Sequence, residues 1–171
     1  MDAHQASGIS THSTMNQEMQ MKGMFSKSML TMVVAATAFA MAQPAAARDD
    51  KLTFPIADAM SAPAAQGKLD GSVKFFFSGQ TAPAAKQTFG TFTSNKKTNA
   101  FNKSDKEACE WTFLSAMIAL QDRAKREGGN AVVDIHSVYK NDEFKSATEY
   151  ECGAGKVMAG VALRGTVVTL P

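Results

Sequence analysis

Asp134 and His136 occupy alternate positions in a segment rich in β-branched residues, so in an extended strand they would share one face. A carboxylate beside an imidazole can transfer protons or bind a metal ion. His136 is the only histidine after residue 47, so Ser-His-Asp or Cys-His catalysis there would depend on it. In the alternative interpretation, both side chains lie on the solvent face of a strand whose other face carries Val133, Ile135 and Tyr139. We expect this alternative, and therefore no catalytic residue.

Cys109 and Cys152 are the only cysteines of the chain. A structural zinc site needs four ligands at close spacings, and a redox-active pair is typically found as CxxC. Neither pattern is present, because the two cysteines are 43 positions apart and no HxH pair accompanies them. We therefore expect a structural disulfide between Cys109 and Cys152 and no metal site.

Residues 153–156 (GAGK) resemble the end of a phosphate-binding loop. The Walker pattern also requires a glycine at the position of Tyr150 and a serine or threonine at the position of Val157. Both requirements fail, so we expect no nucleotide and no other cofactor.

The segment before residue 107 combines lysines with aromatic residues, a combination that can grip phosphates and stack bases: Lys96, Lys97, Lys103 and Lys106, with Phe92 and Phe101. Carboxylates follow immediately, at Asp105, Glu107 and Glu110, and the whole chain has a formal charge of only +2. We therefore expect a solvated basic loop at residues 94–103 and no nucleic-acid partner.

The N-terminal part has the features of an export signal. Lys22 and Lys27 precede an uncharged apolar run at residues 29–42, and the small residues 45–47 (AAA) follow it. This order is typical of a secretory signal peptide, and the run is too short for a comfortable transmembrane helix. We expect a signal peptide at residues 21–47 with cleavage after Ala47, an uncleaved anchor being the alternative. Residues 1–20 are interpreted as disordered or as a mis-assigned start.

The remaining residues, 48–171, predict a single α+β domain. Ser104 and Glu107 have capping-box spacing and begin a helix whose apolar positions recur every three or four residues, until Gly128 and Gly129 end it. Strands are expected at residues 51–56, 72–78, 86–93, 131–139, 143–151 and 157–170, with a short helix ending near Ser61. The order predicts a mainly antiparallel sheet with the long helix on one face.

Two segments carry a resemblance to known families: residues 95–133 (NKKTNAFNKSDKEACEWTFLSAMIALQDRAKREGGNAVV) and 148–165 (TEYECGAGKVMAGVALRG). Their amino-acid sequence resembles that of a family of small exported bacterial proteins labelled "excinuclease ATPase subunit", a label that implies a DNA-repair ATPase. More distantly, the order of helix, strand, Cys-bearing loop and glycine-containing last strand is similar to the α+β domain of the Rcs-type envelope-stress lipoprotein. By that resemblance, Cys109 and Cys152 match one of its disulfide bridges. The cysteines of a second bridge and of a lipid anchor are absent from this sequence.

The sequence thus predicts a non-catalytic periplasmic or secreted protein, held by a disulfide, that binds an envelope protein or a small ligand. No stable membrane span is expected once the signal peptide is removed. The alternatives are a DNA-repair ATPase, as the family label implies, and a small hydrolase using Asp134 and His136.

Overall fold

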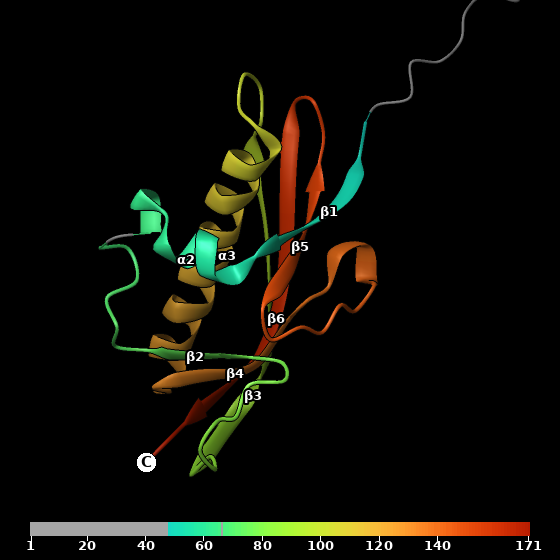
Figure 1. Ribbon diagram of the computed structural model, residues 1–171. Coiled ribbons are helices and arrows are strands. Elements are labelled where there is room, and N and C mark those ends of the chain that lie inside the picture. Colours follow the sequence, from blue (N-terminus) through green and yellow to red (C-terminus); the bar gives the residue numbers. More distant parts are fainter. Residues whose placement is uncertain (1–47, 66) are drawn as a thin grey trace, which may run out of the picture. The chain divides into compact units, whose positions relative to one another are not determined.

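The computed structural model describes residues 48–65 and 67–171, and Figure 1 shows how their elements are arranged. The predicted signal peptide at residues 21–47, its cleavage after Ala47 and the interpretation of residues 1–20 all lie outside the described residues. Within them, no helix combines the length and the apolar character needed to cross a membrane.

Helix α3 (Asp105–Glu127) begins and ends where the sequence predicts. The Ser104 hydroxyl accepts a hydrogen bond from the Glu107 N–H at 3.1 Å, which satisfies one of the free donors of the first turn. At the other end Gly128 has a φ of 82°, a left-handed conformation that glycine adopts without strain, and its N–H donates back to the last turn.

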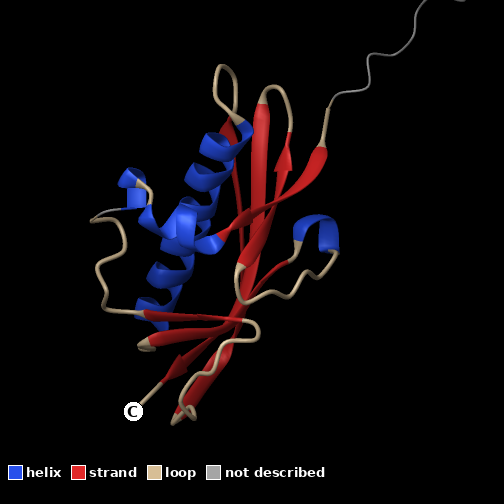
Figure 2. Cartoon of the chain, viewed as in Figure 1, coloured by secondary structure: helices blue, strands red, loops and turns tan. Residues whose placement is uncertain are grey.

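The predicted α+β class is confirmed: a curled sheet of six strands carries α3 on one face (Figure 2). The strand order is β1-β5-β6-β4-β2, with β3 on the other edge of β6. Pairing is antiparallel except between β2 and β4. The strands are β1 (Asp50–Pro55), β2 (Lys74–Phe77), β3 (Gln87–Asn99), β4 (Ala131–Ser137), β5 (Glu149–Ala154) and β6 (Met158–Thr169). Short helices are α2 (Ile56–Ser61), η2 (Pro63–Ala65) and η3 (Tyr139–Asn141).

The sheet forks along β6. One edge of β6 pairs with β3 from Met158 to Thr169. The other edge is shared, because β5 pairs with it only at Ala159 and Gly160, whereas β4 pairs with positions between residues 163 and 168. We call β1, α2, β5 and the segment 146–148 the β1–β5 branch, and β4, β2 and residues 78–80 the β4–β2 branch.

The main core lies between α3 and the sheet face that α3 covers, which we call the helix face. Burying each large apolar side chain there stabilises the fold by about 1.5–3 kcal/mol. Its largest fully buried members come from α3, from β6 and from both branches: Phe113, Met117, Leu120, Val132, Ile135, Tyr150, Val161, Leu163 and Val167.

Two predicted boundaries are wrong. Strand β3 continues to Asn99, so residues 94–99 are not a loop. They form strand because β6 is long enough to pair with them, at positions back to Met158. The segment 143–151 is not one hairpin strand on β4, since only a single bridge joins Ser137 to Phe144 and β5 begins at Glu149 to pair with β1. The short helix ending at Ser61 is confirmed.

Candidate binding site

Cys109 and Cys152 form a disulfide, with their Cα atoms 5.9 Å apart. Cys109 lies near the start of α3, Cys152 lies within β5, and both side chains are fully buried. The bond therefore fixes the β1–β5 branch to the helix. Disulfides persist in oxidising compartments, so this feature is consistent with an extracytoplasmic protein.

A bulge in β4 changes the predicted placement of His136. Asp134 has a φ of 51°, and the register between β4 and β6 shifts between Val133 and His136. An extra residue in one strand re-aims the side chains that follow it. Ile135 is consequently in the core, Asp134 is exposed, and His136 is only 7% exposed. The expectation that Asp134 and His136 both face solvent is therefore wrong for His136.

The His136 ring has one hydrogen bond. Nδ1 lies 2.8 Å from the backbone oxygen of Asp134, to which the Nδ1–H tautomer donates. The carboxylates of Asp134 and Glu143 lie 3.8 and 3.9 Å from the two ring nitrogens, beyond hydrogen-bond distance. Glu143 instead accepts a hydrogen bond from the guanidinium of Arg164 at 2.9 Å. The imidazole is thus not hydrogen-bonded to either acid in this structure.

The glycine-containing segment 153–156 leads from β5 into the strand β6, with Gly155 donating its N–H to the Met158 carbonyl. A phosphate loop presents its N–H groups at the start of a helix, which this turn does not do. In residues 48–65 and 67–171, no group of three or more His, Cys, Asp or Glu side chains is arranged to hold a metal ion.

The lysines that were expected to share a basic loop are separated. Lys96 and Lys97 lie in β3, where consecutive side chains point to opposite faces of the sheet. Lys106 pairs with Asp58 of α2 at 2.7 Å. Phe92 packs against the guanidinium of Arg123, 3.7 Å from the ring centre, rather than standing free to stack a base.

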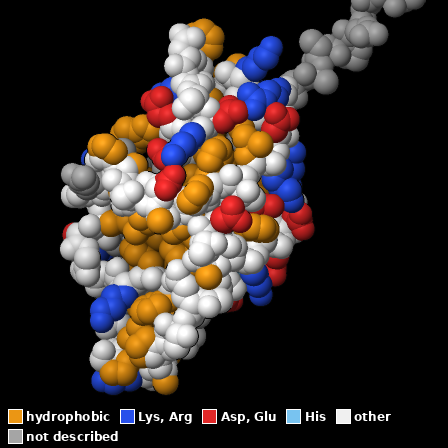
Figure 3. Space-filling model, in the orientation of Figure 1, with side chains coloured by type: hydrophobic (Ala, Val, Ile, Leu, Met, Phe, Trp, Pro, Cys, Tyr) orange, Lys and Arg blue, Asp and Glu red, His pale blue; other side chains and the backbone are white. Residues whose placement is uncertain are grey.

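An apolar pocket lies between the two branches, where sequence reasoning predicted no site. Its volume is about 420 Å³, within the range of small-molecule sites. The β1–β5 branch supplies Ile56, Ala57, Met60, Ala147 and Thr148, and the β4–β2 branch supplies Phe75, Phe77 and Gln80. Figure 3 shows apolar side chains gathered between α2 and β2 on this face.

Gln80 joins the branches at the rim of the pocket. Its Oε1 accepts a hydrogen bond from the Phe77 N–H at 2.9 Å, and its Nε2 donates to the Ala147 carbonyl at 2.9 Å. The segment 146–148 is also fixed to α2, because the Ile56 N–H donates to the Thr148 carbonyl. An amide can make four hydrogen bonds, so Gln80 retains one donor and one acceptor position that a ligand could use.

The wall of the pocket rests on stacked aromatic rings in the core. Phe77 lies 6.2 Å from Phe113, centre to centre, and Phe113 lies 4.2 Å from Tyr150. Burial raises the pKa of Tyr150 above its usual range, so its hydroxyl stays neutral. These rigid rings position Phe75 and Phe77 for contact with a ligand.

Two sequence signals relate to this pocket. Residues 75–77 are three consecutive phenylalanines, whereas a strand with one buried face needs apolar residues only at alternate positions. Ile56 and Met60 are four residues apart and so lie on one side of a short helix. Neither signal shows that α2 and β2 line the same pocket, because α2 follows β1 at one end of the strand order and β2 is at the other end. That juxtaposition depends on the curl of the sheet.

Comparison with models of known protein families, with curated proteins and with solved structures found no match to this chain.

Proposed function

We propose that this chain is a non-catalytic extracytoplasmic protein that binds a small, largely apolar molecule in the pocket between its two branches. The observation that carries the proposal is the pocket itself, whose lining is apolar except for Gln80 and Thr148. Few polar groups at an apolar site orient a ligand and provide specificity. The class of ligand that fits is an uncharged molecule with one hydrogen-bonding group directed at Gln80.

The disulfide supports the extracytoplasmic part of the proposal, together with the export signal predicted from residues 21–47. The buried ring of His136, which has no hydrogen bond to a carboxylate, supports the non-catalytic part.

The test is titration with an uncharged fluorescent probe, N-phenyl-1-naphthylamine. Ala57→Trp places a large side chain in the pocket, and Ala84→Trp makes the same change at an exposed position in the loop before β3. We expect Ala57→Trp to weaken probe binding at least tenfold and Ala84→Trp to leave it unchanged. Equal affinities in the two variants would refute the site.

The alternatives have their own measurements. A DNA-repair ATPase, as the family label implies, should show heat on calorimetric titration with Mg-ATP, which we do not expect because Tyr150 and Val157 break the phosphate-loop pattern. A hydrolase that uses Asp134 and His136 should lose turnover of a screened ester or peptide substrate in His136→Ala.

A further inference from the structure

Two turns lie together at one end of the molecule. Residues 100–104 connect β3 to α3, and residues 155–157 connect β5 to β6. The Ala100 N–H donates to the Val157 carbonyl at 2.8 Å, and Asn99 lies opposite Met158 in the sheet. In Figure 1 both turns lie at the upper end, the same end at which β1 begins.

These turns expose large apolar side chains. Phe101 is 63% exposed, Val157 is 60% exposed and Met158 is 49% exposed, and we call these three residues the apolar tip. Two hydrogen bonds hold the turn that carries Phe101 in place. The Phe101 N–H donates to the Asn99 side chain at 2.8 Å, and the Lys103 N–H donates to the Ala100 carbonyl. The aromatic ring is therefore presented to solvent by an ordered turn, not by a fraying end.

Two lysines flank the apolar tip. Lys103 and Lys156 are exposed within the two turns, and neither turn contains an aspartate or glutamate. The next acidic residue along the chain, Asp105, is paired with the guanidinium of Arg48. Figure 3 shows orange and blue atoms side by side at this upper end.

The start of the described chain also lies here. The backbone oxygen of Arg48 is so close to Gly155 that a Cβ at that glycine would lie 2.7 Å from it. The apolar run at residues 29–42 precedes Arg48 by six positions, a length of chain that spans at most about 20 Å. The chain that precedes the described residues therefore joins the domain at the same end as the apolar tip.

We propose that the apolar tip, with Lys103 and Lys156, docks on the surface of an anionic lipid bilayer. Three side chains at a convex end offer much less area than the roughly 800 Å² that each partner gives to a stable protein–protein interface. A bilayer needs less, since apolar side chains enter the headgroup region while lysines are attracted to anionic lipids. This inference is independent of the pocket, which lies between the branches.

Vesicle sedimentation tests the proposal on the purified exported protein. Vesicles of phosphatidylglycerol and phosphatidylcholine should bind the protein, and vesicles of phosphatidylcholine alone should bind it at least tenfold more weakly. Trp111, the only tryptophan, is 44% exposed and lies about 9 Å along α3 from Asp105, so its emission should shift to the blue on binding.

Two double variants should lose binding. Lys103→Glu with Lys156→Glu should weaken it at least tenfold, because each lysine near an anionic surface strengthens binding about fivefold. Phe101→Ser with Val157→Ser should weaken it similarly by removing the apolar contact.

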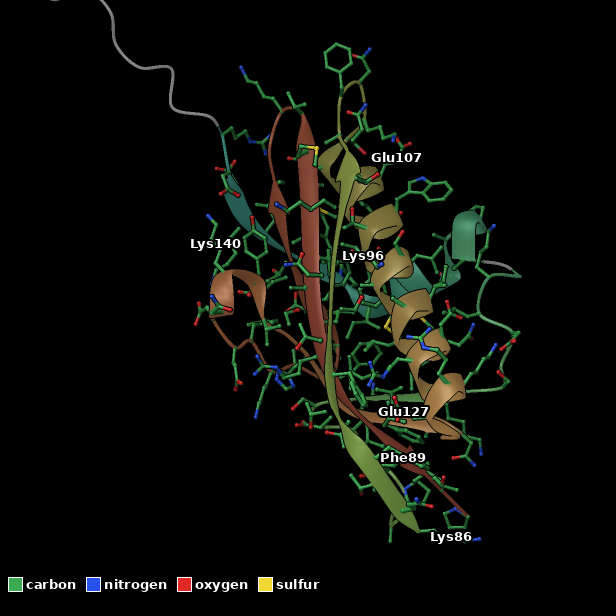
Figure 4. All side chains as sticks on the ribbon, turned by 180° about the vertical axis from the view of Figure 1, so that it is seen from behind. Lys86, Phe89, Lys96, Glu107, Glu127 and Lys140 are labelled. Atoms are coloured by element: carbon green, nitrogen blue, oxygen red, sulfur yellow. A yellow bond between two sulfur atoms is a disulfide. The ribbon has the colours of Figure 1, made fainter. Side chains whose placement is uncertain are left out.

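The matched control is Lys74→Glu with Lys86→Glu, which makes the same charge change at the other end of the sheet. Figure 4 places Lys86 at the opposite end of the molecule from Glu107 of the first turn of α3. Equal loss of binding in the control and in the lysine variant would show that net charge alone causes the interaction, and this would overturn the proposal. So would the absence of binding to anionic vesicles, including a result in which the protein associates only with envelope proteins.

Discussion

The two branches of the sheet are attached to β6 in different ways. The β4–β2 branch is attached by a ladder in which five β4 residues pair with β6 on either side of the bulge. The β1–β5 branch pairs with β6 at only two positions, Gly153 with Gly160 and Ala154 with Ala159. Where the ladder is short, other contacts replace it. The Cys109–Cys152 bond lies on the helix face, and Tyr139 packs on the opposite face, which we call the outer face.

The difference shows how the pocket keeps its shape. Its walls come from both branches, so its width depends on how firmly the β1–β5 branch is held against α3. The disulfide acts on one side of β5, and the packing of η3 acts on the other, because Cys152 and Gly153 point to opposite faces. In Figure 4, Lys140 marks η3 on the side of the strands away from α3.

Removing the disulfide should have the largest effect on how firmly the β1–β5 branch is held. Cys109→Ser with Cys152→Ser opens a loop of 43 residues and should reduce the free energy of unfolding by up to about 4 kcal/mol. Hydrogen exchange should then speed up in β1 and β5 much more than in β4. A uniform increase over both branches, or no fall in the denaturation midpoint, would contradict the role given to the bond. Thiol titration of the unfolded, unreduced protein should find no free thiol in the wild type.

Gly153→Ala should have the next largest effect. A Cβ at Gly153 would lie 1.9 Å from the Tyr139 hydroxyl oxygen, so the ring must move off the outer face at a cost of about 1–3 kcal/mol. Gly160→Ala is the matched control, because its Cβ would lie 3.6 Å from the same ring, an ordinary contact. Thermal unfolding of both variants checks this, and equal midpoints would mean that Tyr139 does not clamp β5.

Lys51→Ala should have a smaller effect on the same branch. Glu151 of β5 is buried, and its carboxylate is paired with Lys51 at 3.1 Å while Lys51 also pairs with Asp142 at 2.7 Å. Losing the cation leaves a buried carboxylate without its partner, which destabilises a fold. Lys97→Ala, an exposed change on β3, should lower the unfolding temperature less. The reverse order would contradict this account of Glu151.

Acid should slightly weaken the contacts that Asp49, the residue before β1, makes with Tyr139 and Lys140. Hydrogen bonds, first from Lys140 and then from Tyr139, hold the pKa of Asp49 below its ordinary value of 3.8. Burial, and then the hydrogen bond to Asp49, raise the pKa of Tyr139 to about 12. A lowered carboxyl pKa in the folded state gives stability that is present above pH 3.8 and is lost as the pH falls below it. Asp49→Asn should therefore lower the unfolding temperature at pH 6 and have less effect at pH 2.5. An effect that does not depend on pH would contradict this contact.

The long helix and the disulfide could be predicted from the sequence, because their signals are local or unique. Ser104, Glu107 and Gly128 define α3, and two cysteines in a chain with a predicted export signal allow one bond. The bulge at Asp134 could not be predicted, since a positive φ at a non-glycine residue depends on the neighbouring ladder. The pocket could not be predicted either, because it arises where α2 and β2 meet across the curled sheet.

Methionine-methyl NMR tests the central claim, that an apolar ligand binds between the two branches. The described residues contain one methionine at the pocket (Met60), one in the core (Met117) and one at the apolar tip (Met158). Titration with N-phenyl-1-naphthylamine should shift the Met60 methyl together with the amides of Gln80 and Thr148, with one saturation curve, and leave the Met158 methyl unmoved. Shifts confined to Met158, or no shift at Met60 at saturating probe, would contradict the account.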